Sequence, residues 1–116
     1  MNSIKQGTII YIDFDPSKGS EIKKRRPAVV LSRDEYSLSS NLIIVCPITS
    51  TDKKRPYFVE IDNDALKKGS MVNAKQVYTL VFTERGGRNI EILGEVSTRE
   101  FINIAQHVQM NFNFPV

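Results

Sequence analysis

The sequence contains one cysteine and one histidine, and these low counts exclude several kinds of site. A single cysteine, Cys46, cannot form an intrachain disulfide and has no CxxC partner for a zinc site. A single histidine, His107, makes histidine-based acid–base catalysis and multi-histidine metal binding hard to assemble. We expect Cys46 to be a buried strand thiol and His107 to be a structural or surface residue. The chemistry of an enzyme with this sequence therefore rests on other side chains.

Long apolar runs are absent as well. No stretch approaches the ~18 consecutive apolar residues of a membrane helix, and the opening "MNSIKQG" lacks the apolar segment of a signal peptide. The sequence also lacks GxxxxGK[ST], GxGxxG and HExxH, which argues against nucleotide hydrolysis, dinucleotide binding and zinc proteases. We therefore expect a cytoplasmic protein with no cofactor, no metal and no membrane partner.

The overall composition is that of an ordinary globular protein. The chain has 116 residues, of which 41% are hydrophobic and 25% charged, so we expect a single domain over residues 1–116. A chain of this length buries a core without disulfides or metals. The net charge of +3 permits a polyanionic partner without requiring one.

Short β-branched and apolar runs, separated by polar, glycine and proline residues, dominate most of the chain. The polar segment Ser32–Asn41 has room for one helical turn. In the first run Ile10, Ile12 and Phe14 share one face. The predicted strands are Thr8–Phe14, Pro27–Ser32, Leu42–Thr49, Tyr57–Asp62, Ser70–Phe82 (one bent strand or two short ones) and Asn89–Val96.

The C-terminal segment changes to a helical period. Its apolar residues fall on one helical face, at Phe101, Ile104, Ala105, Val108 and Phe112. "STRE", which begins at Ser97, predicts a capping box at the helix start, and Pro115 is expected to stop the helix. One helix cannot cover both faces of an open sheet. The expected fold class is therefore mainly β or α+β, with a small curved antiparallel sheet or barrel and one C-terminal amphipathic helix.

The stretch "KGSEIKKRRPAVVLS" places five basic residues within nine positions, directly before an apolar run. Such a run is usually a solvated face, and Lys23, Lys24 and Arg25 fit that interpretation. Arg26 differs because it precedes Pro27, and residues before proline favour extended conformations. The preceding "PSKGSE" contains a glycine turn whose amides are suited to binding an anion. Glu21 lies close to Arg26 in the sequence and is suited to pairing with it or orienting it.

A hydroxyl occupies the end of another apolar run. Thr49 lies where "LIIVCPIT" gives way to the basic segment "STDKKRP". It either holds a turn or, if its strand end neighbours that of Arg26, forms a guanidinium–hydroxyl pair suited to a phosphodiester. The segment Gly86–Gly87, between Arg85 and Arg88, likewise has two interpretations: a surface turn, or a loop that contacts phosphate.

These segments together resemble one known family. "GTIIYIDFDPSKGSEIKKRRPAVVLS" (Gly7–Ser32) is similar to the N-terminal signature of the MazF/PemK (Kid) toxins of type II toxin–antitoxin modules. "VCPITS" (Val45–Ser50) and "KQVYTL" (Lys75–Leu80) resemble the second and third blocks of that family. The closing "GEVS" and helix match its end, so the resemblance covers essentially the whole chain.

The resemblance implies an SH3-like barrel that forms a homodimer and acts as a metal-independent, sequence-specific endoribonuclease. Such toxins cut single-stranded RNA, often mRNA, and thereby inhibit translation and growth. The ribose 2′-hydroxyl attacks the adjacent phosphate, which leaves a 2′,3′-cyclic phosphate and a 5′-hydroxyl end. The resemblance also implies a cognate antitoxin with an acidic disordered tail, through which alone the toxin would reach operator DNA.

The resemblance also implies roles for particular residues. Arg26 and Thr49 fall on the catalytic arginine and threonine of the family, and Glu21 on a glutamate near the site, either as a base or as a residue that orients Arg26. Lys75 stands where many members have aspartate, which affects the target sequence more than the reaction type. The candidate RNA-binding residues are Phe14, Pro16, Lys18, Ser20, Tyr57, Lys75 and Gln76.

Some alternatives stay open. Phe14, Pro16 and Tyr57 offer surfaces on which unstacked bases pack, but each is equally compatible with a core position. A toxin of the same fold that poisons DNA gyrase without catalysis is a second hypothesis, and the joint presence of Arg26, Thr49 and Glu21 argues against it. A third hypothesis is an SH3-like module that only binds RNA.

Overall fold

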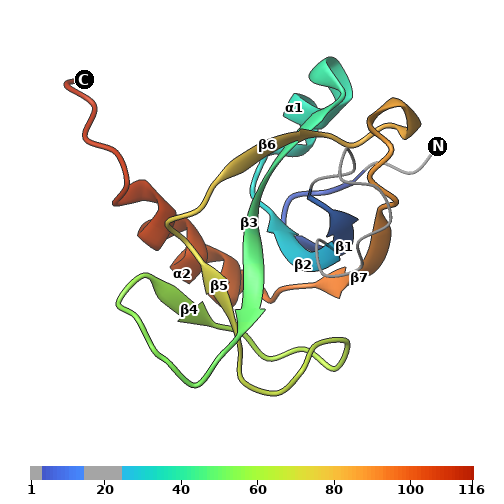
Figure 1. Ribbon diagram of the computed structural model, residues 1–116. Helices are drawn as coiled ribbons and strands as arrows, with labels where there is room; N and C mark the ends of the chain where they lie inside the picture. Colours follow the sequence, from blue (N-terminus) through green and yellow to red (C-terminus); the bar gives the residue numbers. More distant parts are fainter. Residues whose placement is uncertain (1–3, 15–24) are drawn as a thin grey trace.

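The computed structural model describes residues 4–14 and 25–116 (Figure 1). Four of the candidate site residues lie outside this part of the chain, namely Pro16, Lys18, Ser20 and Glu21. The elements are β1 (Thr8–Asp13), β2 (Arg25–Val30), α1 (Asp34–Ser40), β3 (Leu42–Ser50), β4 (Phe58–Glu60), β5 (Ser70–Asn73), β6 (Tyr78–Val81), the short 3-10 helix η3 (Glu84–Gly86), β7 (Glu91–Glu95) and α2 (Thr98–Gln109).

The strands form one antiparallel sheet in the order β4-β5-β3-β2-β1-β7, with β6 also paired to β3. The long strand β3 connects the two parts of the sheet, because its first half pairs with β6 and its last residues pair with β5. Figure 1 shows β3 running through the middle of the molecule with these two partners along it. The structure confirms the predicted mainly β class, with Ser70–Phe82 divided into two short strands.

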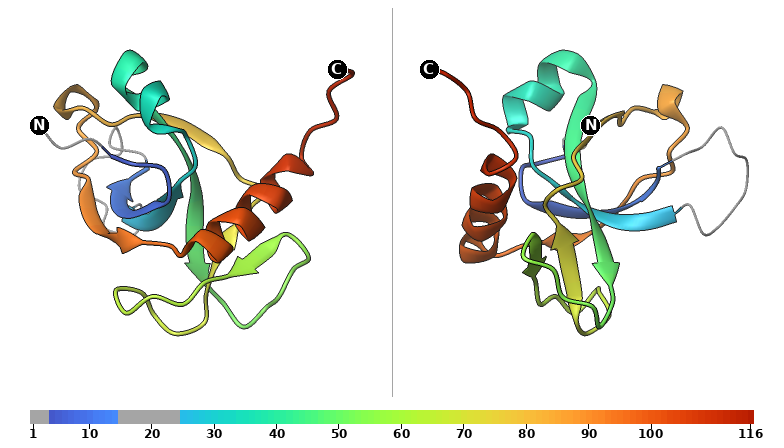
Figure 2. Two further views of the ribbon diagram at one scale, coloured as in Figure 1. Left: turned by 180° about the vertical axis from the view of Figure 1, so that it is seen from behind. Right: turned by 60° about the vertical axis from the view of Figure 1, so that its left-hand side comes forward.

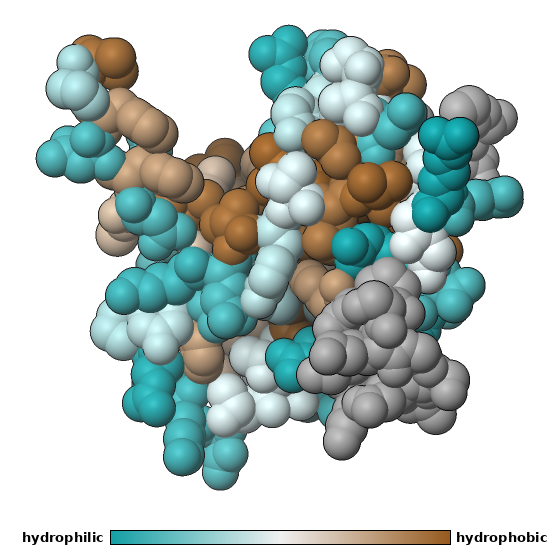
Figure 3. All heavy atoms as spheres, turned by 45° about the horizontal axis from the view of Figure 1, so that its top comes forward, coloured by the Kyte–Doolittle hydropathy of each residue, from teal (hydrophilic) through white to brown (hydrophobic). Residues whose placement is uncertain are grey.

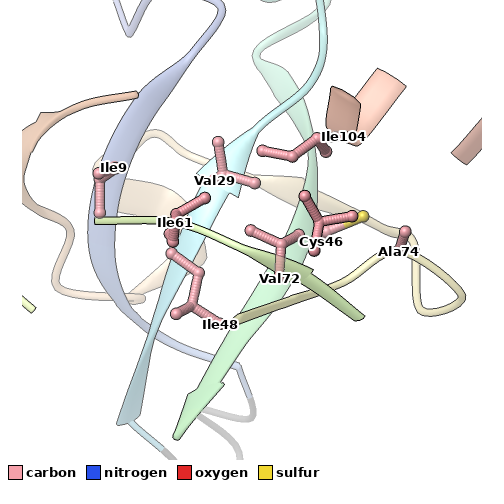
Figure 4. Packing of buried hydrophobic residues seen from close by; sticks show 9 residues of the cluster. Ile9, Val29, Cys46, Ile48, Ile61, Val72, Ala74 and Ile104 are labelled. Carbon is pink, nitrogen blue, oxygen red and sulfur yellow. The ribbon is translucent and has the colours of Figure 1, made fainter. Parts of the chain in front are cut away.

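Two clusters of buried side chains fill the molecule, one on each face of the curved strands. Along β1, Ile9 joins the first cluster, whereas Ile10 and Ile12 join the second, as the period-2 alternation of a strand requires. Figure 4 shows the first cluster, in which Ile104 of α2 points toward Val29 and Cys46 of the sheet. Figure 2 shows α2 lying across one face of the sheet, next to β4 and β5.

Helix α2 begins with the capping box that the sequence predicts. The amide of Glu100 donates to Ser97 Oγ at 3.1 Å, and the amide of Ser97 donates to Glu100 Oε1 at 2.9 Å. The other carboxylate oxygen, Glu100 Oε2, accepts from the amide of Asp62 at 2.8 Å. One side chain therefore fixes both the helix start and the segment that follows β4.

We expect Ser97→Ala to lower the free energy of unfolding by about 1 kcal/mol, because the Glu100 amide loses the Ser97 Oγ acceptor, while the main-chain amide of residue 97 keeps its bond to Glu100 Oε1. Chemical denaturation followed by circular dichroism measures this change. Thr98→Ala, at the exposed first residue of the same helix, is the control and should change stability by less than about 0.5 kcal/mol. Equal losses in the two variants would contradict the capping role.

The end of α2 differs from the prediction. The helix stops at Gln109 instead of continuing toward Pro115, because the amides of the next residues bond to carbonyls three positions back. The amide side chain of Asn111 donates to Ala74 O at 2.7 Å and directs the chain away from the helical path. Phe112 therefore lies beyond the helix, 51% exposed, and its ring stacks on that of Phe114 at 5.3 Å.

Two strands also differ in ways that affect side-chain direction. Strand β2 begins at Arg25, so Pro27 is its third residue and Arg26 lies within the strand. In the sequence Ile90 and Ile92 alternate with polar neighbours, but Ile90 precedes β7 and Ile92 is 52% exposed. The register of β7 with β1 shifts between Ile92 and Gly94. Leu93 packs against the first cluster in place of Ile92, which is the effect of one extra residue in a strand.

Candidate active site

Arg26 and Thr49 lie at the same end of two neighbouring strands. Arg26 is the second residue of β2 and Thr49 the second-to-last residue of β3, and the two strands are antiparallel partners. Their ladder ends at the pair Ala28–Pro47; two residues further on, Arg26 pairs with Ile12 of β1 and Thr49 with Met71 of β5. The neighbouring strand ends on which a guanidinium–hydroxyl pair depends are therefore present.

The two adjacent arginines of β2 lie on opposite faces of the strand. Arg26 alternates with Ala28 and Val30, which belong to the second cluster, and its side chain is exposed at the rim. Arg25 alternates with Pro27 and Val29 and faces the first cluster. The sequence places the two guanidiniums side by side, whereas the strand separates them.

Arg25 is not the solvated charge that the sequence indicates. Its Nη1 donates to Asp13 Oδ1 at 3.3 Å, its guanidinium carbon lies 4.6 Å from the centre of the Tyr11 ring, and only 22% of its side chain is exposed. Asn89 Nδ2 donates to the other carboxylate oxygen, Asp13 Oδ2, at 3.2 Å. Counting back in steps of two from the buried Val29 is the sequence signal that identifies Arg25 as an inward-facing residue.

A pocket of about 300 Å³ opens beside Arg25, where β2 begins and β3 ends. Its apolar wall comes from Pro27, Ile48, Leu66 and Leu93. Its polar lining consists of Tyr11, Arg25, Thr49, Ser50, Lys67 and Ser70. Two cations and several hydroxyls around a cavity of this size are suited to an anion.

The exit of β1 is fixed by Arg88. Its Nη1 donates to Asp13 O at 3.1 Å and to Phe14 O at 2.7 Å, so this guanidinium is engaged by the main chain. The preceding Gly86–Gly87 forms the end of η3, which supports the surface-turn interpretation. Phe14 packs against the second cluster, and its ring meets that of Tyr78 edge-on at 5.1 Å.

Three other candidates gather in a different part of the molecule. Lys75 Nζ lies 5.1 Å from the centre of the Tyr57 ring, and Gln76 Oε1 accepts from Asn73 Nδ2 at 3.3 Å. Tyr57 and Lys75 line a second pocket of about 340 Å³ together with Pro56, His107, Met110 and Asn111. The two pockets share no lining residue, so the chain does not bring Tyr57 and Lys75 into the pocket beside Arg25.

Cys46 and His107 lie in surroundings typical of structural residues. Burial raises the pKa of the Cys46 thiol to about 12, so the thiolate needed of a nucleophile is disfavoured. His107 Nδ1 lies 2.8 Å from Asn103 O on the same helix. Across residues 4–14 and 25–116, no group of three or more histidine, cysteine, aspartate or glutamate side chains is arranged to hold a metal ion. Nor does any helix of this part have the length and apolar character needed to cross a membrane.

Comparison with known proteins places this geometry in a family. Residues 5–112 match the model of the PemK-like, MazF-like toxins of type II toxin–antitoxin systems. The chain is 35% identical over 80 residues to the endoribonuclease toxin MazF of Escherichia coli K12, covering 69% of this chain and 70% of that protein. It is 28% identical over 115 residues to endoribonuclease MazF9 of Mycobacterium tuberculosis, covering 95% and 97% of the two chains.

Solved structures agree with these matches. A crystal structure of MazF from Deinococcus radiodurans superposes with a TM-score of 0.78 at 27% identity, covering 95% of this chain and 96% of that one. The MazE–MazF complex of the same organism superposes with a TM-score of 0.75 at 24% identity, covering 95% of both chains. The family expected from the sequence segments is thereby confirmed. The chain belongs to the MazF/PemK family of endoribonuclease toxins of type II toxin–antitoxin systems.

Proposed function

We propose that this endoribonuclease cleaves single-stranded RNA, chiefly mRNA, at a phosphate held between Arg26 and Thr49, without a metal ion. The observation that supports the proposal is that Arg26 and Thr49 lie at the same end of the β2–β3 pair, each two residues beyond the last pair of their ladder, Ala28–Pro47. An exposed guanidinium and a hydroxyl at a strand end are suited to the non-bridging oxygens of a phosphodiester.

In the proposed reaction the nucleophile belongs to the substrate. The ribose 2′-hydroxyl oxygen attacks the adjacent phosphorus and loses its proton to a base, while the bond from phosphorus to the 5′-oxygen breaks. The leaving 5′-oxygen takes up a proton, so the products are a 2′,3′-cyclic phosphate and a 5′-hydroxyl end. A reaction of this kind needs no nucleophilic serine, cysteine or histidine from the protein.

The assigned roles follow from the chemistry of each group. Arg26 stabilises the negative charge that develops on the phosphorane oxygens, because its charged guanidinium presents a planar fork of N–H donors to them. Thr49 holds a phosphate oxygen through its hydroxyl. Glu21, which lies outside the described residues, acts as the base or orients Arg26.

The RNA strand extends from this point over further residues. Phe14 and Pro16 offer surfaces against which unstacked bases pack, and Lys18 and Ser20 contact the backbone. Tyr57, Lys75 and Gln76 contact a more distant part of the strand, which the cation over the tyrosine ring supports. Because Lys75 replaces a common aspartate of the family, the sequence that is cut differs from that of members with the acidic residue.

We propose two protein partners. A MazE–MazF complex and a mycobacterial endoribonuclease bound to its cognate antitoxin are among the structural relatives, and they support a cognate antitoxin whose acidic disordered tail covers the basic RNA-binding surface. Contact with operator DNA would run through that antitoxin.

A second copy of the chain is the other partner. Met110 and Phe114 are 74% and 67% exposed, and Figure 3 shows hydrophobic side chains, in brown, gathered near the middle of the face that it displays. Monomers rarely expose large apolar areas of this kind, which supports a homodimer. The proposed substrate, mRNA, places its action in the cytoplasm.

Incubation of purified protein with single-stranded RNA in EDTA tests the reaction. We expect cleavage to persist at an unchanged rate after metal removal, because charge stabilisation comes from Arg26. Mass spectrometry of the fragments should find 2′,3′-cyclic phosphate and 5′-hydroxyl ends. Ends of the opposite kind, with a 5′-phosphate, would rule out attack by the 2′-hydroxyl. An intact RNA together with inhibition of DNA gyrase would instead favour the non-catalytic toxin.

A further inference from the structure

We propose that the pocket beside Arg25 binds a second phosphate of the RNA strand, adjacent to the phosphate cleaved at Arg26, through Arg25 and Lys67. This inference rests on the proposed function, because it adds a subsite to the same RNA. It follows from the alternation of β2, which directs two consecutive guanidiniums to opposite faces of one strand end. A strand of RNA that crosses this end meets both.

Arg25 is held in place with donors to spare. The Asp13 carboxylate takes one N–H of a guanidinium that has five, and the Tyr11 ring lies 4.6 Å beneath it. Both carboxylate oxygens of Asp13 are already bonded, one to Arg25 and the other to Asn89. The planar fork of Arg25 is thus preorganised, and because its ion pair with Asp13 carries no net charge, Lys67 supplies the net positive charge of the pocket.

Lys67 lies across the pocket on a fixed turn. Its carbonyl oxygen accepts from the amide of Ser70 at 3.2 Å and from Ser70 Oγ at 2.6 Å. Ser70 is only 4% exposed and pairs with Ser50 in the β3–β5 ladder, which ties this turn to the end of β3. The main chain of Lys67 is therefore rigid, and within residues 4–14 and 25–116 no carboxylate forms a salt bridge with its ammonium group.

The segment that carries Lys67 is anchored at its other end as well. Asn63 Nδ2 donates to Glu95 O at 3.2 Å, and Asn63 Oδ1 accepts from the amide of Ala65 at 2.9 Å. Glu100 holds the amide of Asp62 at 2.8 Å. The pocket wall is thus built before any ligand arrives, which lowers the cost of binding.

A phosphate fits the pocket better than the carboxylates of an acidic protein tail. The lining combines one guanidinium fork, one ammonium and several small hydroxyls within about 300 Å³, which suits a compact group with several acceptor oxygens. The pocket also opens at the strand ends that carry the proposed cleavage position, since Thr49 contributes to its lining while Arg26 projects from the opposite face of β2. The experiment below distinguishes RNA binding in this pocket from binding of an acidic peptide.

Lys67 and Lys68 provide a matched pair for the test. They are adjacent, exposed and of equal charge, and only Lys67 lines the pocket. The probe is a short fluorescein-labelled RNA of mixed sequence in which every 2′-hydroxyl is methylated, so that it binds without being cut. Fluorescence anisotropy gives Kd as a function of salt concentration for the wild type and for Lys67→Gln, Lys67→Arg and Lys68→Gln.

We expect Lys67→Gln to weaken binding about tenfold at low salt. The slope of log K against log[salt] should fall by about 0.7, the contribution of one phosphate contact to a single strand. Lys67→Arg should restore the slope, and Lys68→Gln should leave it at the wild-type value. Equal effects of Lys67→Gln and Lys68→Gln would show a diffuse surface charge and overturn the proposal.

Two further outcomes separate this inference from the proposed reaction. If unmodified RNA is cleaved normally but Lys67→Gln leaves the slope unchanged, the pocket proposal fails and the reaction stands. If RNA is not cleaved but the slope falls only in Lys67→Gln, the pocket is supported and the reaction fails. A loss confined to binding of a polyglutamate peptide would assign the pocket to an acidic protein segment and overturn the RNA proposal.

Discussion

Arg26→Ala is expected to reduce RNA cleavage by about 10²- to 10³-fold while leaving the protein folded. The magnitude is that of removing one preorganised group that stabilises developing negative charge. The fold should survive because the Arg26 side chain is exposed at the rim of β2 and belongs to neither buried cluster. Cleavage of a labelled RNA gives the rate, and thermal unfolding gives the stability, which should change by less than about 0.5 kcal/mol.

Arg99→Ala is the control for a general loss of positive charge. Arg99 is exposed in the first turn of α2, so its removal changes the net charge by the same amount. It should cleave at close to the wild-type rate. If Arg26→Ala cleaves as fast as this control, Arg26 has no catalytic role, and if its melting temperature falls sharply, the residue is structural.

Ile104→Ala is expected to produce the largest loss of stability, about 2–5 kcal/mol. Ile104 is fully buried in the first cluster and is the one residue of α2 in that class, so it attaches the helix to the sheet. Its truncation leaves a cavity between α2 and the strands. Chemical denaturation gives the free energy of unfolding, of which this loss is a large part for a domain of this size.

Ile102→Ala on the same helix is the matched control. Ile102 is 51% exposed, and alanine is the better helix former, so stability should change by less than about 1 kcal/mol. Ile104→Val covers the case in which Ile104→Ala does not fold, with an expected loss of about 0.5–1.5 kcal/mol. Similar losses for Ile102→Ala and Ile104→Ala would mean that α2 is not anchored through Ile104.

Most of the fold follows from local patterns in the sequence. Alternation predicted the face shared by Ile10, Ile12 and Phe14, and the capping box at Ser97 predicted the start of α2. The errors arose where one interaction between distant residues overrides the pattern. The end of α2 depends on the bond from Asn111 to Ala74, and the inward position of Leu93 depends on an irregular pairing of β7 with β1. Neither the hydrogen bond nor the irregular strand pairing can be derived from the local sequence.

In the candidate site, too, some features follow from local sequence and others depend on distant residues. That Arg26 and Thr49 lie at neighbouring strand ends follows from the positions of two apolar runs, together with antiparallel pairing. The environment of Arg25 does not follow, because it depends on Asp13 and Tyr11 of another strand and on Asn89, far along the chain. Lys67 was missed because no local pattern marks a lysine between predicted strands as part of a pocket wall.

The pairing of β1 with β7 has a consequence for the order of events during protein synthesis. Strand β1 lies near the start of the chain, but one of its two neighbours comes from residues 91–95, and Ile104 completes the core later still. Domains fold as units, and contacts between distant segments form late. A ribosome-bound chain that still lacks these residues has one edge of β1 unpaired, an incomplete first cluster and no Leu93 wall in the pocket. The surroundings of β1 are therefore completed only by residues from the C-terminal part of the chain.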